Sequence, residues 1–303
     1  NFDIAEWMII ELVKALPANG ILAMLCKTST ARKSLLHFWK SELPVANESV
    51  YLIDAKKYFN VSVSACLLVI RKGINTENSA RVYDSINNRK CLSRFGLRNK
   101  ELISNLDDYE CYKILDGSSH YTWRSGIKHD AAKVMEIQPS ENSFLNGFKE
   151  KIKLENTFIY PLLKSSDVGN NKINPRKYVI VTQKNVGQNT IHIQDEAPLT
   201  WEYLENHGDF LDSRQSLIYR NRPRFSIFGI GDYSFSPWKI AISGLYKNLN
   251  FLAIPPVDGK PVMVDDTCYF IPCQTQTEAK FWEKLLNSES CIRFLHSLIF
   301  FDA

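Results

Sequence analysis

The 303-residue sequence lacks several features that would assign it to a class of protein at once. It contains no apolar run near the roughly 18 residues that a membrane helix needs, and its longest runs, such as Ala65 to Ile70, have the length of a strand. A composition of 45% hydrophobic and 23% charged residues is not that of a disordered chain. The sequence therefore predicts a globular protein that does not span a membrane.

An excess of one charge and a cysteine framework are also missing. The 37 basic and 33 acidic residues give a net charge of +4, so charge alone indicates no partner. Seven cysteines without a repeating spacing are typical of a reducing compartment, and we expect a cytoplasmic location. Cys268 and Cys273 are close in sequence, but without a second pair they indicate buried thiols rather than a zinc site, and we expect no metal.

The chain also has no phosphate-binding loop ending in Gly-Lys-Ser/Thr and no complete dinucleotide fingerprint. The run Phe228 to Tyr233 places two glycines after a strand, where backbone amides could approach a phosphate, but a tight turn or a bulge is the plainer interpretation. His129 and Asp130 stand beside Lys128 without a nucleophile or a second carboxylate nearby, which favours an ordinary polar loop.

Helices and strands alternate in the first part of the chain. Helical spacing from Ala5 to Leu16 predicts an amphipathic helix, and Ile21 to Cys26 predicts a strand buried on both faces, as in a parallel sheet. A second helix is expected over Ala31 to Leu43. Two strands follow, Val50 to Ile53 and Val61 to Ile70, and their short connection requires antiparallel pairing. The sheet is therefore expected to be mixed.

The pattern changes near Asp116 to His120, where we place a domain boundary. A helix is predicted over Leu97 to Leu106 before it, and short strands predominate after it. Thr275 and Glu278 have the spacing of a capping box that opens a terminal helix or helix pair. We therefore predict an α/β domain over residues 1–118 and an α+β domain over residues 119–303.

Basic residues gather in two spans of the second part that contain no acidic residue. The first span holds Lys172, Arg176, Lys177 and Lys184, and the second holds Arg214, Arg220, Arg222 and Arg224. Aromatic residues lie among those of the second span, which suits phosphate contacts and base stacking on a nucleic acid. A solvated face is the alternative interpretation.

Six runs of the chain support a resemblance to a known family. Three lie in the first part: ILAMLCKTS from Ile21 to Ser29, DAKKYF from Asp54 to Phe59, and VSVSACLLVI from Val61 to Ile70. They resemble the later motifs of adenine-N6 DNA methyltransferases. Three further runs resemble the target-recognition domain of the fused restriction-modification enzymes of this family: Tyr121 to Asp130, Ile218 to Phe225, and Phe228 to Lys239.

The resemblance covers nearly the whole chain and implies the C-terminal part of such a bacterial enzyme. The family's sheet has seven strands, the last antiparallel and inserted between its neighbours, and the resemblance places only the final three in this chain. The family's Gly-rich cofactor turn and its Asn-Pro-Pro-aromatic motif do not occur here. We therefore expect S-adenosylmethionine to serve the intact protein only, with no catalytic residue and no methyl transfer in this chain alone.

The resemblance also implies roles for particular residues. It implies that Phe59 stacks on the flipped adenine, with Tyr58 as the alternative, although a core aromatic is also an open interpretation. In the second domain, the resembling runs and the basic spans together supply the candidate DNA-binding residues: Trp123, Arg124, Lys128, Lys184, Arg214, Arg220, Arg222, Arg224 and Lys239.

The expected partners are double-stranded DNA and the N-terminal part of the same methyltransferase, and the presence of a nuclease domain in that part is left open. Without that part, the sheet edge beside Ile21 to Cys26 predicts self-association of the chain. Two alternatives remain open. One is a stand-alone nucleic-acid or protein interaction module derived from such an enzyme, and the other is a small-molecule enzyme that uses the loop from Gly229 to Tyr233.

Overall fold

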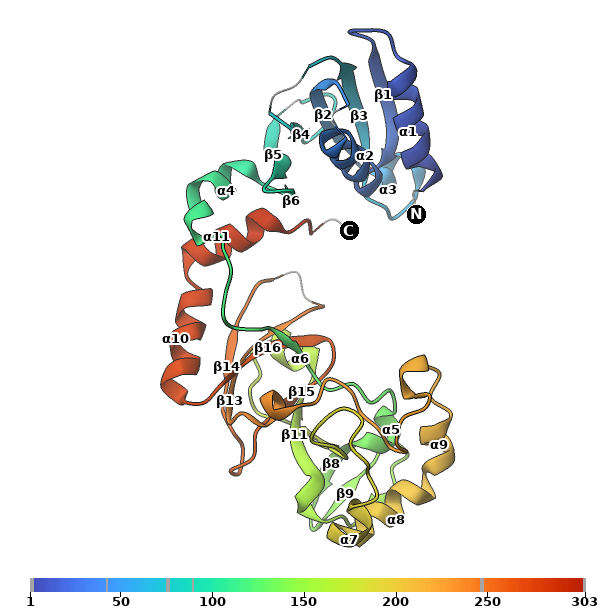
Figure 1. Ribbon diagram of the computed structural model, residues 1–303, viewed down its shortest axis with the longest axis vertical. Helices are drawn as coiled ribbons and strands as arrows, with labels where there is room; N and C mark the ends of the chain where they lie inside the picture. The colour runs from blue at the N-terminus through green and yellow to red at the C-terminus, as the bar shows by residue number, and fades with distance from the viewer. Residues whose placement is uncertain (1–2, 42, 75–76, 89, 246–247, 302–303) are drawn as a thin grey trace. The chain divides into compact units, whose positions relative to one another are not determined.

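The computed structural model describes residues 3–41, 43–74, 77–88, 90–245 and 248–301. It divides the chain into two compact units, which are treated separately (Figure 1). The first unit comprises Asn1–Gly117 and Glu289–Ala303, and the second comprises Ser118–Ser288. Among the described residues, no helix has the length and apolar character needed to cross a bilayer.

The first unit is built on a six-stranded mixed sheet with the strand order β1-β3-β2-β4-β5-β6. The strands are β1 (Ile21–Lys27), β2 (Val45–Ile53), β3 (Ala65–Lys72), β4 (Ser79–Tyr83), β5 (Cys91–Arg98) and β6 (Glu101–Ile103). Strand β3 lies between β1 and β2 and pairs antiparallel with both, while β2 and β4 are parallel. The predicted mixed sheet is confirmed. Three strands beyond those implied by the resemblance extend it.

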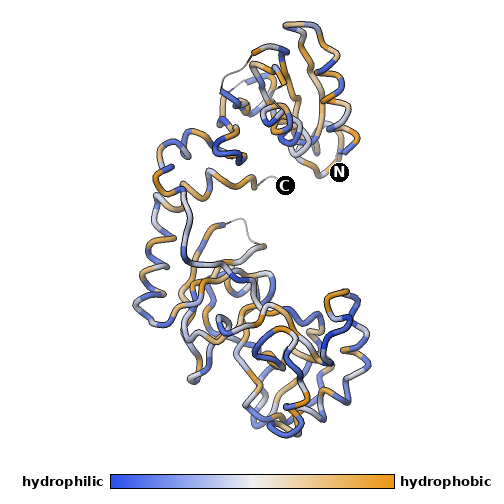
Figure 2. Tube along the Cα trace, in the orientation of Figure 1, coloured by the Kyte–Doolittle hydropathy of each residue, from blue (hydrophilic) through white to orange (hydrophobic). Residues whose placement is uncertain are grey.

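Helices α1 (Ile4–Ala15) and α2 (Thr28–Lys40) cover one face of this sheet. Their buried side chains, including Ile9, Leu35 and Phe38, pack with alternate residues of β3, including Leu68 and Ile70. The strands carry long apolar stretches, drawn orange in Figure 2.

Strand β1 departs from the prediction that it is buried on both faces. Its side chains alternate between exposed and partly buried, because β1 is an edge strand that α1 and α2 cover on one side only. Ile21 is 64% exposed and Leu25 is 49% exposed. An apolar, unpaired edge therefore lies where the sequence predicted it.

The predicted helix over Leu97 to Leu106 is wrong, because the chain forms a hairpin there. Strands β5 and β6 pair antiparallel, with Arg98 opposite Glu101. Asn99 and Lys100, between them, both have positive φ angles of 49° and 68°. Two such residues in a two-residue loop form the type I′ turn whose twist matches a hairpin. The turn therefore overrides the apolar spacing.

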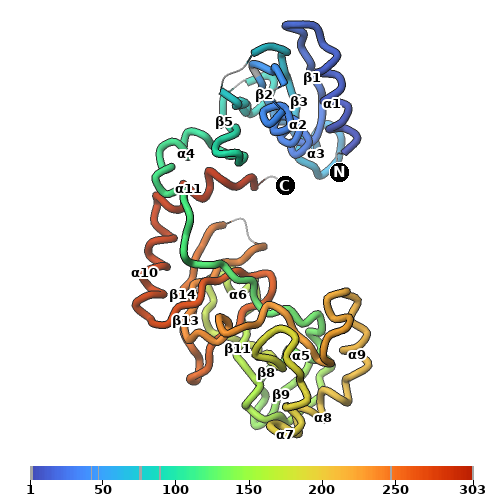
Figure 3. The backbone as a smooth tube through the Cα atoms, viewed as in Figure 1, coloured from blue at the N-terminus to red at the C-terminus, as the bar shows by residue number. Residues whose placement is uncertain are grey.

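The first unit is completed by two longer helices, a short helix and a 3-10 turn. These are α4 (Leu106–Tyr112), α11 (Glu289–Leu298), α3 (Ala55–Phe59) and the turn at Lys113–Leu115. Figure 3 shows α11, in red, beside α4, in blue-green. Phe294 of α11 packs with Ile103, Leu106 and Tyr109. The backbone amides of Ser104 and Asn105 both donate to the Ser297 carbonyl.

Helix α11 therefore corrects the predicted extent of the second domain, 119–303, because residues from Glu289 onward pack with the first unit. The division after Gly117 lies one residue from the predicted boundary after 118.

The second unit contains two sheets, with the orders β10-β9-β8-β12-β11-β15 and β14-β13-β16-β7. Its strands are β7 (Arg124–Ser125), β8 (Glu136–Ser140), β9 (Ser143–Leu145), β10 (Lys151–Ile152), β11 (Ile159–Leu163), β12 (Lys177–Ile180), β13 (Trp238–Ser243), β14 (Leu252–Ile254), β15 (Met263–Val264) and β16 (Cys268–Cys273). Its helices are α5 (Ala132–Met135), α6 (Ser165–Gly169), α7 (Ile193–Glu196), α8 (Pro198–Asn206), α9 (Gly208–Asp212) and α10 (Gln276–Leu286).

Two features of the second unit match the sequence analysis. The unit is α+β, with short strands as predicted. Thr275 caps α10 by accepting a hydrogen bond from the Glu278 amide at 3.2 Å, and the Glu278 carboxylate accepts one from the Gln274 amide at 2.8 Å. The predicted N-cap at Thr275 is confirmed, but the Glu278 carboxylate bonds to the Gln274 amide instead of the Thr275 amide that a full capping box uses.

A buried ion network joins strands of this unit. The Glu136 carboxylate is 4% exposed and accepts hydrogen bonds from Lys164 at 2.6 Å and Lys177 at 2.7 Å. His129 Nε2 lies 3.5 Å from the same carboxylate. Burial alone would raise the pKa of Glu136, but the hydrogen bonds from His129, Lys164 and Lys177 outweigh it and hold the pKa well below its usual range.

Candidate nucleic-acid interface

The fold brings the two basic spans of the second unit together. Thr182 Oγ1 donates to the Phe225 carbonyl at 2.7 Å, and the Ile227 amide donates to Gln183 Oε1 at 3.0 Å. Thr190 Oγ1 donates to the Arg224 carbonyl at 2.7 Å. These bonds hold the loop after β12 against the loop after α9. No pattern in the sequence indicated this contact between segments 34 to 44 residues apart.

Two arginines of this surface have structural partners. The Arg214 guanidinium donates to the carbonyls of Leu211, His129 and Ser226 at 2.7 to 3.2 Å and lies 3.8 Å from the centre of the Tyr219 ring. Arg224 pairs with Glu205 at 2.7 Å and with Asp212 at 3.0 Å. The predicted DNA contacts of Arg214 and Arg224 are therefore not favoured, because these side chains are already engaged within the unit.

Gly208 shows how closely the Arg224 side chain is held. A Cβ atom at Gly208 would clash with the Arg224 guanidinium, so a larger residue there would require the Arg224 side chain to move. The ion pairs of Arg224 and its close fit over Gly208 connect the end of α8 to the loop from Arg220 to Arg224.

Arg220 and Arg222 differ from these two. Both are exposed, and neither forms an ion pair within the described ranges. The Arg222 guanidinium lies 5.9 Å from the centre of the Phe228 ring. A Cβ atom at Gly187 would lie 3.5 Å from Arg222 Nη1, which places Arg222 beside the loop that carries the exposed Lys184. We call Lys184, Arg220 and Arg222 the free basic surface.

The remaining candidates of the strand β7 region have different surroundings. Arg124 is exposed and its guanidinium lies 4.7 Å from the Tyr233 ring centre, and Trp123 is 39% exposed and packs on Phe251. Lys128 pairs with Asp130 and with Asp266, both at 2.9 Å, and these hydrogen bonds raise its pKa. Arg124 therefore remains available to an anion, whereas Lys128 is neutralised by two carboxylates.

Lys239 corrects the sequence analysis. Its side chain is 1% exposed and donates to the Ser236 carbonyl at 2.9 Å, so it cannot contact DNA from this position. Burial lowers the pKa of Lys239 to about 7. The residue lies on β13, whose apolar neighbours enclose it, and the resemblance to a recognition motif could not reveal that burial.

In the first unit, Tyr58 and Phe59 end the short helix α3. Asp54 caps this helix by accepting from the Lys57 amide at 2.9 Å, and Asn60 ends it with a φ of 55°. Tyr58 is 62% exposed and Phe59 is 52% exposed, which contradicts the interpretation of a core aromatic.

A cavity of about 560 Å³ lies beside these rings and is also lined by Asp54, Lys57 and Asp84. An exposed aromatic ring at the rim of a cavity can stack on a base, so the geometry leaves both Tyr58 and Phe59 available for that role.

A second cavity of the first unit lies at the end of β1 and β2. It measures about 660 Å³ and is lined by Lys27, Lys56 and several hydroxyl residues, including Thr28 and Ser62. The Thr28 hydroxyl is buried and has no hydrogen-bond partner among the described residues. The sequence analysis did not single out Thr28 or this cavity, because three separate connections form it.

The glycine-containing loop from Phe228 to Tyr233 is a close backbone crossing. Gly229 has a φ of 64°, and a Cβ atom there would lie 2.0 Å from the Gly126 carbonyl oxygen. Lys128 and Phe228 exchange backbone hydrogen bonds at 2.9 and 2.8 Å. This geometry agrees with the tight-turn interpretation rather than with a phosphate-binding loop.

The expected burial of Cys268 and Cys273 is confirmed. Both are free thiols. Over the part of the chain that the structure describes, no group of three or more His, Cys, Asp or Glu side chains could hold a metal ion.

The sequence of this chain is similar to that of a known methyltransferase. The chain is 47% identical over 306 residues to the Type II methyltransferase M.NspV of a Nostoc species, and the match covers all of this chain and 64% of that protein. The similarity to restriction-modification methyltransferases is therefore confirmed. No family model matches the sequence.

A solved structure shares the fold. The Type IIL restriction-modification enzyme MmeI, determined in complex with DNA, matches 92% of this chain and 37% of its own chain with a TM-score of 0.52 and 13% identity. At that identity the match supports the fold alone. The chain spans less than two thirds of the methyltransferase relative and just over a third of this structural neighbour.

Proposed function

We propose that this chain recognises double-stranded DNA as part of a site-specific adenine-N6 DNA methyltransferase of a restriction-modification system. The observation that carries the proposal is the free basic surface, where Arg220 and Arg222 are exposed without ion pairs while Arg214 and Arg224 are engaged. The 47% identity to a Type II methyltransferase supports the same assignment.

The free basic surface suits two kinds of DNA contact. An arginine guanidinium binds phosphate oxygens or the O6 and N7 atoms of guanine through paired N–H donors. Phosphate contacts position the protein on the duplex, and base contacts select the sequence. Arg220 and Arg222 lie close in sequence on one exposed loop, so they can contact neighbouring groups of one strand.

The first unit would supply one wall of the pocket for the target base. Methyl transfer to an adenine amino group needs the base outside the helix stack, where an aromatic ring can hold it. In our proposal Phe59 stacks on that base, and Tyr58 is the alternative. Both rings are more than half exposed, which leaves them accessible to a flipped base.

The 660 Å³ cavity of the first unit does not suit S-adenosylmethionine. The 660 Å³ cavity is lined by Lys27 and Lys56, and its one carboxylate, Asp54, caps helix α3. Two ammonium groups oppose binding of a sulfonium cation. We therefore assign no step to the cofactor in this chain, expect no methyl transfer by it alone, and propose that the methyl donor binds elsewhere in the intact enzyme.

Fluorescence anisotropy with a labelled duplex tests the DNA-binding role. We expect the double variant Arg220→Ala/Arg222→Ala to bind at least tenfold more weakly, because each lost contact costs about 1–3 kcal/mol. The slope of log affinity against log salt should fall by about 0.9 for each lost phosphate contact.

The double variant Lys153→Ala/Lys284→Ala is the matched control, because both lysines are exposed and it removes the same charge. Equal loss in the control variant would show that only net charge matters. Unchanged affinity of the arginine variant would overturn the assignment of this surface.

A further inference from the structure

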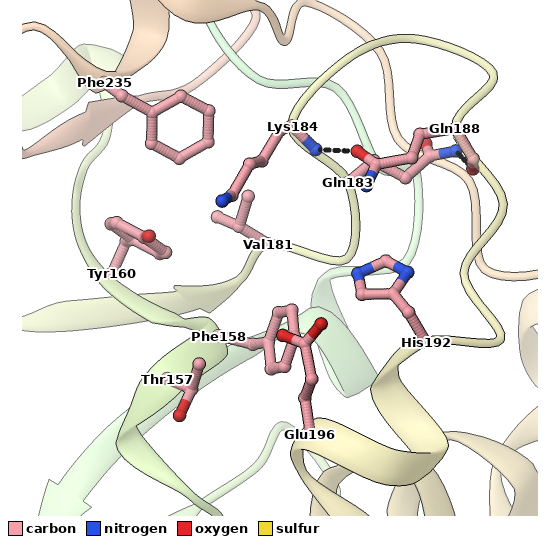
Figure 4. Close-up of a pocket in the computed structure, with 10 residues that line it drawn as sticks. All are labelled: Thr157, Phe158, Tyr160, Val181, Gln183, Lys184, Gln188, His192, Glu196 and Phe235. Carbon is pink, nitrogen blue, oxygen red and sulfur yellow. Dashed lines mark hydrogen bonds between the residues drawn. The ribbon is translucent and has the colours of Figure 1, made fainter.

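A small cavity of about 180 Å³ lies within the second unit (Figure 4). Phe158, Tyr160 and Phe235 give it an aromatic part, and Lys184, His192 and Glu196 give it a polar part. Drug-sized ligands occupy about 300–1,000 Å³, so this cavity has room for one planar heterocycle rather than for a larger ligand.

The polar groups of the cavity are free to bind. Figure 4 shows the Lys184 ammonium and the Glu196 carboxylate directed into the space between the labelled residues. Within the described ranges neither group forms an ion pair, and Lys184 is instead fixed through its backbone amide, which donates to Gln188 Oε1 at 2.7 Å. The cavity therefore presents a cationic donor and an anionic acceptor.

His192 adds a second acceptor. Its Nδ1 atom lies 2.8 Å from the Asn189 carbonyl oxygen, and because a carbonyl can only accept, Nδ1 carries the proton. In the neutral ring Nε2 is then an acceptor. The cavity thus combines aromatic walls with one strong donor and two acceptors.

This set of groups matches the edge of guanine. That edge has two adjacent N–H donors, at N1 and N2, which one carboxylate can accept together, and a carbonyl at O6, which an ammonium can meet. Adenine has an amino donor but no carbonyl, so it leaves Lys184 without a partner. Bases taken out of the helix are read by hydrogen bonds to this edge and by stacking.

We propose that this cavity binds a guanine base, with Glu196 accepting the N1 and N2 protons and Lys184 donating to O6. The base can come from a free guanine nucleotide or from a guanine outside the stack of bound DNA. The second source rests on the proposed DNA-binding function, and Lys184, which belongs both to the cavity and to the free basic surface, connects the two sites.

Titration of the full chain with guanosine 5′-monophosphate, followed by calorimetry, tests the free-nucleotide source. We expect saturable binding that adenosine 5′-monophosphate does not reproduce, and at least a tenfold loss of affinity in Glu196→Gln. The matched control is Glu202→Gln, an exposed carboxylate outside the cavity, which should bind as the unaltered chain does. Thermal melts of both variants establish that they fold.

A duplex with a single bulged guanine tests the DNA source, compared with a bulged adenine and with the fully paired duplex. Glu196→Gln removes a negative charge, so it should strengthen or leave unchanged the binding of paired DNA while it abolishes the preference for bulged guanine. These opposite signs separate the cavity from general electrostatics.

The outcomes distinguish the two proposals. Nucleotide binding without any duplex binding would support the cavity and overturn the DNA-binding function. Duplex binding with neither nucleotide binding nor a bulged-guanine preference would overturn the cavity proposal alone. Equal guanine affinity in Glu196→Gln and the unaltered chain would also overturn it.

Discussion

The two units of this chain bury charged groups to different extents. The first unit packs an apolar core against its sheet, and the carboxylates of its buried Glu6 and Glu48 lie 3.1 Å from Lys33 Nζ and Trp39 Nε1 respectively. The second unit buries Glu136 among three basic side chains and encloses Lys239 completely.

The buried ion pairs of the second unit show that the sequence alone cannot tell which of its basic residues are free to bind a ligand. Lys164, Lys177, Arg214 and Arg224 serve the fold, whereas Arg220 and Arg222 do not. The free basic surface stands out because the neighbouring arginines Arg214 and Arg224 already have partners within the unit. We therefore expect substitutions of buried, paired groups to change stability and substitutions of exposed, unpaired groups to change binding.

The largest effect is expected from Glu136→Gln. Removing one partner of a buried ion network leaves the others uncompensated and typically costs about 3–5 kcal/mol. Calorimetric unfolding should show a large loss in the second unit and none in the first. A uniform shift of both units, or no shift, would contradict the division.

The pH dependence of this variant has a defined sign. Since the pKa of Glu136 is lowered in the folded state, its stabilisation is complete above the unfolded pKa, about 4.3, and declines as the pH falls further. The stability difference between the unaltered chain and Glu136→Gln should therefore be constant from about pH 6 to 8 and shrink below about pH 4.

Lys239→Met should stabilise the second unit. Burial lowers the pKa of Lys239 to about 7, whereas an unfolded lysine titrates near 10.4. Between these values the unfolded state binds one more proton, so the stability of the unaltered chain rises by about 1.4 kcal/mol per pH unit. The advantage of Lys239→Met should be greatest at pH 7 or below and shrink toward pH 10. Denaturant unfolding at both pH values measures it, and a pH-independent difference would argue against a neutral buried amine.

Local patterns predicted much of this fold. The antiparallel pairing of β2 with β3 follows from two apolar strands with a short connection, and Thr275 with Glu278 marked the start of α10. The hairpin of β5 and β6 was missed because its turn uses Asn99 and Lys100, and a lysine with a positive φ is uncommon. Its apolar spacing alone could not distinguish the strands from a helix.

The site was predictable in composition but not in detail. The sequence identified the basic spans, and the family resemblance singled out Tyr58 and Phe59 without showing that they are exposed. Neither could separate Arg214 from Arg220 or reveal the burial of Lys239. Those distinctions depend on carbonyls and strands distant in sequence, such as the His129 carbonyl that accepts from Arg214. The packing of α11 against α4 was missed for the same reason.

Arg214→Ala tests whether the paired arginines of the second unit differ in role from the unpaired ones. The guanidinium hydrogen-bonds to three carbonyls, and losing a charged donor to such groups costs about 1.5–3 kcal/mol. Chemical denaturation should show this loss, while Arg220→Ala/Arg222→Ala should change the free energy of unfolding by less than about 0.5 kcal/mol. Equal destabilisation by both variants would place Arg220 and Arg222 among the structural residues.

The smallest effect on stability is expected from Phe59→Ala. Its ring is 52% exposed, and exposed positions usually change the free energy of unfolding by no more than about 0.5 kcal/mol. Phe95 is the matched control in the same unit, because its ring is 2% exposed and its truncation should cost about 3–5 kcal/mol.

Duplexes that carry 2-aminopurine in place of single adenines then report whether the ring of Phe59 or Tyr58 stacks on a base. If Phe59 stacks on an extrahelical base, Phe59→Ala should raise the fluorescence of that probe in the complex without lowering the melting temperature. If Phe59→Ala lowers the melting temperature as much as Phe95→Ala does, Phe59 is a core residue and Tyr58 becomes the candidate for base stacking.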